Sequence, residues 1–205
     1  MKRGIFITFE GPEGSGKSTH AKRLSSFLKS KGHSVILLRE PGGTKISEEI
    51  RRILLDKRNK KIDSKTEALL YLAARAQLVK EKITPALKSG RIVILDRFQD
   101  STIVYQGHGG GLDLSLLDKL GRFVTEGLIP DLTFLLDINT KEGLRRCGLK
   151  DRMEKKSFSF HQRVRKGYLE LAKKNPKRFF LIEVDRDIDA VSKRIEKKVL
   201  EIISR

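Results

Sequence analysis

The feature that most constrains this chain of 205 residues is the stretch EGPEGSGKST, residues 10–19, which contains the pattern GxxxxGKS. An apolar run at residues 4–9 precedes it and a helical pattern follows it, and in that context the motif forms a phosphate-binding loop, or P-loop. The glycines of such a loop turn backbone N–H groups toward phosphate oxygens, and the N-terminus of the next helix adds partial positive charge. The sequence therefore predicts a nucleoside triphosphate site at this loop.

Three side chains of the P-loop carry separate expectations. Lys17 places a point charge near the outer phosphates, and the hydroxyl of Ser18 is suited to ligate Mg²⁺. Glu13 is unexpected, because it puts a carboxylate inside a loop that binds anions. One explanation is that this carboxylate faces solvent or caps the following helix.

Length and composition favour one intracellular domain. A chain of this size suffices for a single α/β domain over residues 1–205 that buries roughly 70% of its unfolded surface. The apolar runs are far too short to span a membrane, and the N-terminus lacks a stretch of signal-peptide length. The single cysteine, Cys147, excludes an intrachain disulfide and fits a reducing cytoplasm, so we expect a cytoplasmic protein without a membrane partner in which this thiol is incidental.

The net charge of +18 raises the question of a nucleic-acid partner. Basic residues are spread along the chain among many acidic ones, with only small clusters at residues 57–61 and 173–178. Scattered charge is typical of solvated faces, and a basic protein also attracts polyphosphate substrates. We therefore expect small-molecule substrates and no nucleic acid.

Short apolar runs alternate with helical patterns along the chain. Runs without a polar face are typical of buried parallel strands, and the alternation predicts an α/β fold with a doubly wound sheet. Ligands bind such sheets at the carboxyl ends of the strands. The expected strands are residues 5–9, 35–38, 92–95, 132–136 and 179–184, and the clearest helical patterns are residues 18–31, 48–55, 67–88 and 115–126.

Two motifs follow expected strands and so fall at that edge. REPGGT, residues 39–44, is either a plain connector or a turn that holds a second, acceptor phosphate. In DRF, residues 96–98, Asp96 either caps a helix or orients Mg²⁺ through its water shell. Arg97 beside it offers a planar fork suited to a phosphate.

Two helical segments are also candidates. Tyr71 and Arg75 stand at i and i+4 on one helix face, where the ring either packs in the core or stacks on a flat base. The basic stretch at residues 145–171, with a glycine at position 148, is either a solvated helix face or a lid over phosphates.

With these motifs in this order and at these spacings, the chain from Gly4 to about Val184 resembles the thymidylate kinase family. The resemblance implies ATP-dependent phosphorylation of dTMP to dTDP, with ATP as co-substrate and Mg²⁺ as cofactor. It also implies a P-loop nucleoside monophosphate kinase fold with a five-stranded parallel sheet, a lid at approximately residues 145–158, and a homodimer.

The same resemblance assigns the site residues. The ATP phosphates would be held by Gly11, Pro12, Glu13, Gly14, Ser15, Gly16, Lys17, Ser18 and Thr19. The dTMP site would consist of Glu13, Arg39, Tyr71, Arg75, Arg97, Thr102, Tyr105 and Gln106, and the metal site of Ser18 and Asp96. Within these sets, Tyr71 would stack on thymine, Arg75 would donate to O4, Thr102 would reach N3 and Tyr105 would crowd the sugar 2′ position. Glu13 would point away from ATP and accept a hydrogen bond from the dTMP 3′-hydroxyl, directly or through water.

Lys17, Arg97, Arg152 and Glu13 are the expected catalytic residues. One branch of the family carries a basic residue after the acid of the P-loop, but here that position is Gly14, so the lid must supply the charge that stabilises the transferring phosphoryl group. Arg152 is our first candidate, and Arg145, Arg146 and Lys150 are the others.

Two alternative functions stay open at this point. One is another P-loop kinase of small molecules, such as a general nucleoside monophosphate or deoxynucleoside kinase. The other is a nucleic-acid-binding P-loop ATPase or a catalytically silent binding module, which the basic charge supports weakly.

Overall fold

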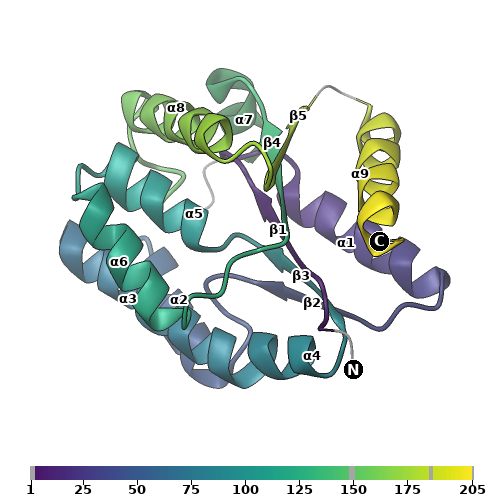
Figure 1. Cartoon of the computed structure of the whole chain (residues 1–205). Coiled ribbons are helices and arrows are strands. Elements are labelled where there is room, and N and C mark those ends of the chain that lie inside the picture. The colour runs from purple at the N-terminus through teal and green to yellow at the C-terminus, as the bar shows by residue number, and fades with distance from the viewer. Residues whose placement is uncertain (1–2, 148–150, 185–186, 205) are drawn as a thin grey trace.

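A five-stranded sheet forms the centre of the molecule (Figure 1). The computed structural model describes residues 3–147, 151–184 and 187–204. All pairings in the sheet are parallel and the strand order is β2-β3-β1-β4-β5. The five expected runs all became strands, and the predicted α/β fold is confirmed. The strands are β1 (Phe6–Glu10), β2 (Val35–Arg39), β3 (Ile92–Asp96), β4 (Leu132–Asp137) and β5 (Phe179–Glu183).

The sheet is covered on both faces because its strands are apolar on both sides. On one face, Ile7 and Phe9 of β1 pack with Leu24 of helix α1 (Lys17–Ser30) and with helix α9 (Ile188–Ile203). The alternate residues of β1 and β3 pack on the other face, against the helical run that precedes β3. Figure 1 shows α1 and α9 together on one side and the remaining long helices on the other.

The expected helix at residues 67–88 is one helical run with a wider turn inside it. It consists of α3 (Ser64–Leu78), the π-helical turn η1 (Val79–Ile83) and α4 (Thr84–Lys88). Pro85 stands at the start of α4 and has no N–H to donate to the preceding turn, so a π-helical turn just before it accommodates the lost hydrogen bond. Helix α2 (Lys45–Leu55) corresponds to the pattern expected at residues 48–55 but begins earlier, because the Thr44 side chain caps it by accepting from the Ser47 N–H at 3.1 Å.

Helix α6 (Leu114–Val124) confirms the helical pattern expected at residues 115–126. The remaining helices lie beyond the clearest sequence patterns. They are α5 (Gln99–Thr102) with the π-helical segment η2 (Ile103–Gly109), α7 (Thr140–Cys147) and α8 (Phe158–Lys174). The described part of the expected lid consists of the end of α7, a turn at residues 151–156 and the start of α8, and residues 148–150 lie outside the described residues. Among the described residues, no helix is long and apolar enough to cross a membrane.

Candidate active site

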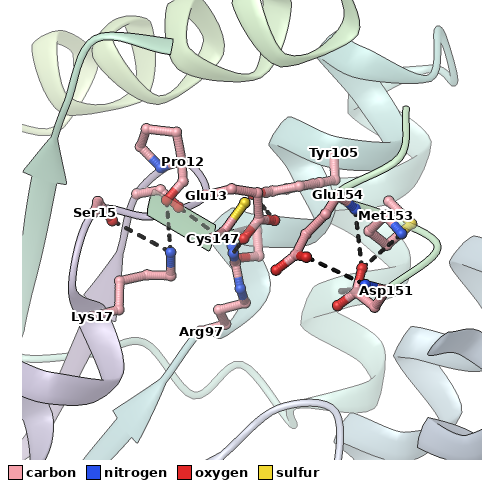
Figure 2. Close-up of polar contacts among 12 residues, drawn as sticks. Pro12, Glu13, Ser15, Lys17, Arg97, Tyr105, Cys147, Asp151, Met153 and Glu154 are labelled. Carbon is pink, nitrogen blue, oxygen red and sulfur yellow. Dashed lines mark hydrogen bonds and ion pairs between the residues drawn. The ribbon is translucent and has the colours of Figure 1, made fainter. Parts of the chain in front are cut away.

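A cavity of about 350 Å³ lies at the carboxyl edge of the sheet. Figure 2 shows P-loop residues at one side of it and Asp151, Met153 and Glu154 at the other. The sequence-predicted residues in its lining are Glu13, Gly14, Gly16, Lys17, Ser18, Thr19, Arg39, Tyr71, Arg75, Asp96, Arg97, Thr102, Tyr105 and Gln106. Residues far apart in the chain thus meet where the strand ends were expected to place them.

The P-loop packs closely against helix α7 through two glycines. Gly14 has a φ of +70°, and a Cβ added there would lie 2.0 Å from the carbonyl oxygen of Gly143. A Cβ on Gly143 would in turn lie 2.3 Å from the Glu13 carbonyl oxygen. Any larger side chain at position 14 would therefore separate the P-loop from α7, which explains why this loop carries no basic residue there.

Lys17 is buried and tied to its own loop. Its Nζ donates to the Pro12 carbonyl oxygen at 2.8 Å and to Ser15 Oγ at 3.3 Å (Figure 2). Burial, followed by the nearby charge of Arg97, lowers the pKa of Lys17 to about 8, although Glu13 acts in the opposite direction. A bound polyphosphate would favour the charged lysine.

Glu13 turns away from the P-loop backbone and toward the opposite half of the cavity. Its Oε1 accepts from the Tyr105 hydroxyl at 2.7 Å, and its Oε2 accepts from Arg97 Nη2 at 2.9 Å (Figure 2). Burial alone would raise the pKa of Glu13, but Arg97, Lys17 and the hydrogen bond from Tyr105 outweigh it and lower that pKa. Similarly, burial disfavours the charged form of Arg97, but the carboxylate of Glu13 raises the pKa of Arg97 well above its usual range.

The backbone at Arg97 is held in an uncommon conformation. Its φ of +70° lies in the left-handed region, which costs a residue with a side chain about 1 kcal/mol or more. The turn is fixed because the Arg97 N–H donates to the Phe9 carbonyl at 3.0 Å and the Phe98 N–H donates to Glu10 Oε1 at 2.7 Å. This arrangement aims the guanidinium at Glu13 rather than along the strand.

Two oxygen groups suited to a hard cation meet beside the P-loop. The Ser18 hydroxyl donates directly to an Asp96 carboxylate oxygen, so β3 and the start of α1 bring both predicted metal residues together. A hydroxyl, a carboxylate, phosphate oxygens and water form the ligand set that Mg²⁺ prefers in phosphate sites. The donor atoms of this pair therefore fit the implied ion.

On the opposite side, Arg75 is wholly buried between two helices. Its Nε and Nη2 donate to Glu40 Oε2 at 2.8 and 2.5 Å, and its Nη1 donates to Gln99 Oε1 at 2.7 Å and to Thr102 Oγ1 at 2.9 Å. A guanidinium has five N–H donors. These four bonds among the described residues leave one N–H of Nη2 for a ligand. Tyr71, one turn earlier on α3, lines the cavity next to it.

Gln106 belongs to the same wall and is held by Glu67. The Gln106 amide donates to Glu67 Oε1 at 2.9 Å, and Glu67 Oε2 lies 2.6 Å from Arg152 Nη2. Arg152 also donates from Nε to the Leu54 carbonyl oxygen at 2.8 Å. The structure therefore places Arg152, our first candidate for the catalytic cation, outside the lining of the cavity and 7% exposed.

The other candidate cations lie in different surroundings. Arg145 and Arg146 extend from α7 and share Glu142, at 2.8 and 2.9 Å, while Lys150 lies outside the described residues. Arg39 is exposed, lines the cavity and contacts Glu48 at 3.2 Å.

Several residues of the cavity wall were missed by the sequence analysis. Among them are Glu40, which anchors Arg75; Arg51, whose Nη1 donates to the Pro41 carbonyl at 2.8 Å; and Cys147, which we had expected to be incidental. Glu40 stands inside the quoted REPGGT motif, and its pairing with a helix 35 residues later could not be deduced from spacing alone.

The fold and site define a class. A P-loop on a parallel sheet shares one cavity with a set of buried polar side chains, and the cations Lys17 and Arg97 lie in that cavity. This is the arrangement of a P-loop kinase that transfers a phosphoryl group to a small acceptor. The comparisons with known proteins give the particular family. The family model for thymidylate kinase matches residues 9–195 of this chain. The chain therefore belongs to the thymidylate kinase family.

Individual relatives agree over nearly their whole length. The chain is 48% identical to a thymidylate kinase of Caldanaerobacter subterraneus subsp. tengcongensis, with 98% of this chain and 97% of the relative covered. It is 43% identical to a thymidylate kinase of Thermoanaerobacter pseudethanolicus, with 99% and 98% covered. The crystal structure of a thymidylate kinase from Ehrlichia chaffeensis is 39% identical and superimposes with a TM-score of 0.80, covering 97% of this chain and 99% of that one. The chain is thus a phosphotransferase that uses ATP to convert dTMP to dTDP, which decides against both alternative functions.

Proposed function

We propose that this catalytic site has two halves, with dTMP bound between α3 and α5/η2 and the ATP phosphates bound by the P-loop. The observation that carries this assignment is the orientation of Glu13, whose carboxylate is held by Arg97 and Tyr105 on the side of the proposed dTMP half. An acid in that orientation does not repel the ATP phosphates and is available to accept from the sugar 3′-hydroxyl of dTMP. Arg97, still carrying its charge at neutral pH, would bind the acceptor phosphate, assisted by Arg39 from the adjacent strand.

The base of dTMP would lie against Tyr71. The free N–H of Arg75 can donate to thymine O4, and Thr102 Oγ1, which already accepts from Arg75, has a second lone pair for the N3–H. Gln106 would line the same pocket. Tyr105, fixed by its bond to Glu13, would stand where a ribose 2′-hydroxyl would have to fit, and a buried steric wall can discriminate against one hydroxyl.

A second cavity, of about 370 Å³, supports a position for the donor nucleoside. It adjoins the P-loop at Gly14 and Gly16 and is lined by Arg146, Val184 and Ile188 among others. A planar guanidinium and two branched apolar side chains suit the faces of an adenine ring. We propose that adenosine binds there, with Mg²⁺ held between the ATP phosphates and the pair Ser18 and Asp96, where it would neutralise developing charge.

Catalysis in such a site comes from positioning and from cations around the transferring phosphoryl group, since the acceptor is already an anionic phosphate. Lys17 and Arg97 meet this need from the two halves. A third cation would come from Arg145, Arg146 or Arg152. Arg152 would have to leave Glu67 to reach the phosphates. If it is the catalytic cation, Arg152→Ala lowers kcat by on the order of 10³ with a smaller change in nucleotide affinity; a near wild-type kcat removes Arg152 from that role.

We also propose a single-domain enzyme of the cytoplasm that acts as a homodimer and without nucleic acid. An exposed apolar face supports the dimer: α3 packs against both α2 and α6, and these helices carry Ile53, Leu69, Leu116 and Phe123, the last 80% exposed. Sedimentation of the wild type as a dimer and of Leu69→Glu as a monomer is the expected result. A monomeric wild type contradicts this part of the proposal.

The acceptor assignment is tested by a coupled assay across dTMP, dUMP, UMP, CMP and AMP. We expect dTMP to give the highest kcat/KM, and the ribonucleotides to be excluded by Tyr105. A variant Tyr105→Ala that gains no activity on UMP would remove that tyrosine from sugar selection.

A further inference from the structure

Glu67 connects four parts of the molecule at a buried point outside the reacting centre. Its carboxylate contacts Gln106 of η2 with one oxygen and Arg152 with the other, at 2.9 and 2.6 Å. Arg152 in turn reaches the Leu54 carbonyl at the end of α2. Glu67 and Arg152 each have a side chain only 7% exposed, so the pair is isolated from solvent. Replacing one of the two by a neutral residue therefore leaves the other as a buried charge without its counter-charge.

The neighbours of Arg152 form a wall of the active-site cavity. Asp151 Oδ1 accepts from the backbone N–H groups of Met153 and Glu154 at 2.8 and 3.0 Å, which folds this segment into a tight turn (Figure 2). Asp151, Met153 and Glu154 line the cavity, whereas Arg152 contacts Glu67 and Leu54 behind it. Arg152 therefore ties this turn to α3 and to the end of α2, while Met153 packs in the core beside Tyr105.

Glu67 also stands on the face of α3 that forms the acceptor pocket. It precedes Tyr71 by one turn and Arg75 by two, so the three side chains share one stripe of the helix. The stripe meets α5 and η2 through Arg75 at Thr102 and through Glu67 at Gln106. One carboxylate thus fixes both the base pocket and the turn that closes the cavity.

We infer that Glu67 is a positioning residue for dTMP: through Arg152 and Gln106 it holds the 151–154 turn and the base pocket in register. This rests on the proposed acceptor pocket, and it assigns Arg152 an anchoring role that differs from that of a catalytic cation. The two roles give different kinetics. An anchor governs KM for dTMP, whereas a cation on the transferring phosphoryl group governs kcat.

The test is a double-mutant cycle of Glu67→Gln and Arg152→Met with steady-state kinetics on both substrates. Gln at position 67 keeps an acceptor for Gln106 but turns an N–H₂ group toward Arg152, so only the anchor is lost. We expect each single variant to raise KM for dTMP about tenfold, because the turn loses its buried ion-pair contact with α3, with little change in KM for ATP. The double variant, which has no unpaired buried charge and should fold, should match the singles instead of multiplying them.

Two further variants separate the possible failures. Asp137→Asn breaks another ion pair, with Arg165 at 2.7 Å, in which the aspartate is buried and the arginine is 34% exposed; neither residue lines the cavity, so the variant should lower the melting temperature without changing KM for dTMP. Effects of Glu67→Gln and Arg152→Met that multiply, or that change kcat alone, overturn the inference. If Tyr71→Ala leaves KM for dTMP unchanged, the proposed acceptor pocket itself is wrong. If Tyr71→Ala raises KM for dTMP and Glu67→Gln does not, the pocket stands and only the positioning role of Glu67 is contradicted.

Discussion

The two halves of the active site are built differently. The acceptor half consists of buried side chains that already satisfy one another: Arg75 is 1% exposed and has four hydrogen bonds before any ligand arrives. The donor half is a backbone loop that contains the buried Lys17 and lies beside charged side chains at the surface. Ser18 and Thr19 are exposed, and Arg145 has a side chain 70% exposed.

This difference corresponds to what each half must distinguish. A pocket that selects one base needs fixed donors and acceptors, because discrimination arises when a wrong base leaves buried polar groups unpaired. Polyphosphate is recognised by charge and by backbone N–H groups, which need no extended side-chain network. We therefore expect substitutions in the hydrogen-bonded side-chain network of the acceptor half to affect stability as well as dTMP selectivity, and substitutions in the donor half to affect function alone.

The largest effect should come from Arg75→Met. Burial raises the pKa of Glu40, against the opposing effect of Arg75, so removal of the guanidinium leaves a carboxyl group buried without its counter-charge. We expect a loss of about 3–5 kcal/mol in the free energy of unfolding, measured by urea denaturation. Arg145→Met is the matched control on the donor side, and its urea midpoint should equal that of the wild type. Equal destabilisation by both variants would abolish the contrast between the halves.

Tyr71→Ala should change acceptor binding rather than stability. Loss of a stacking surface is worth about 1–3 kcal/mol per base, which corresponds to a rise in KM for dTMP of about 10- to 100-fold. KM for ATP should remain near that of the wild type. Parallel rises in both constants would indicate that the ring only supports packing.

Glu13→Gln tests the link between the halves. The variant retains an acceptor for Tyr105 but loses the charge that binds Arg97, so we expect dTMP to bind about tenfold more weakly while ATP binding is spared. The comparison ligand is 3′-deoxy-dTMP, which lacks the hydroxyl that Glu13 is proposed to bind and should therefore bind wild type and variant alike. An Arg97→Lys variant is the control that measures how much of the loss comes from a disturbed Arg97. Unchanged dTMP affinity in Glu13→Gln would leave this carboxylate only the structural role of holding Arg97 and Tyr105.

The smallest effect is a difference in pH dependence between the two substrates. Burial lowers the pKa of Lys17 to about 8, so its charge in the free enzyme disappears as the pH rises through that value. We expect kcat/KM for ATP to fall above about pH 8, since this constant reports the free enzyme. Arg97, with its raised pKa, keeps kcat/KM for dTMP level over the same range. A flat ATP profile up to about pH 9.5 would show that Lys17 stays charged.

The parts of this site that could be predicted from sequence are those carried by local motifs. The P-loop, the DRF turn and the i, i+4 pair of Tyr71 and Arg75 each have a short-range signature, and the alternation of apolar runs predicted which edge of the sheet they would share. The fold followed from the same alternation. Helices α7 and α8 could not be predicted, because their dense positive charge is equally compatible with a solvated helix and with a lid.

The parts that could not be predicted depend on contacts between distant segments. Glu67 has no motif of its own, and its importance arises only when residues 39 and 85 positions later in the chain meet its two oxygens. The pairing of Arg152 with Glu67 likewise cannot be deduced from a count of lid arginines. Gly14 is the reverse case: the sequence marked it as a missing charge, and the structure gives the reason, which is its close contact with Gly143.

Hydrogen exchange measured by mass spectrometry tests the contrast between the halves most directly. Amides in α3 and in residues 99–109 should exchange slowly in the ligand-free enzyme and change little on addition of dTMP, because their side-chain network is complete beforehand. Amides of the P-loop and α7 should exchange faster and become protected when ATP binds. Slow exchange in α3 that develops only with dTMP would contradict a pre-assembled acceptor pocket.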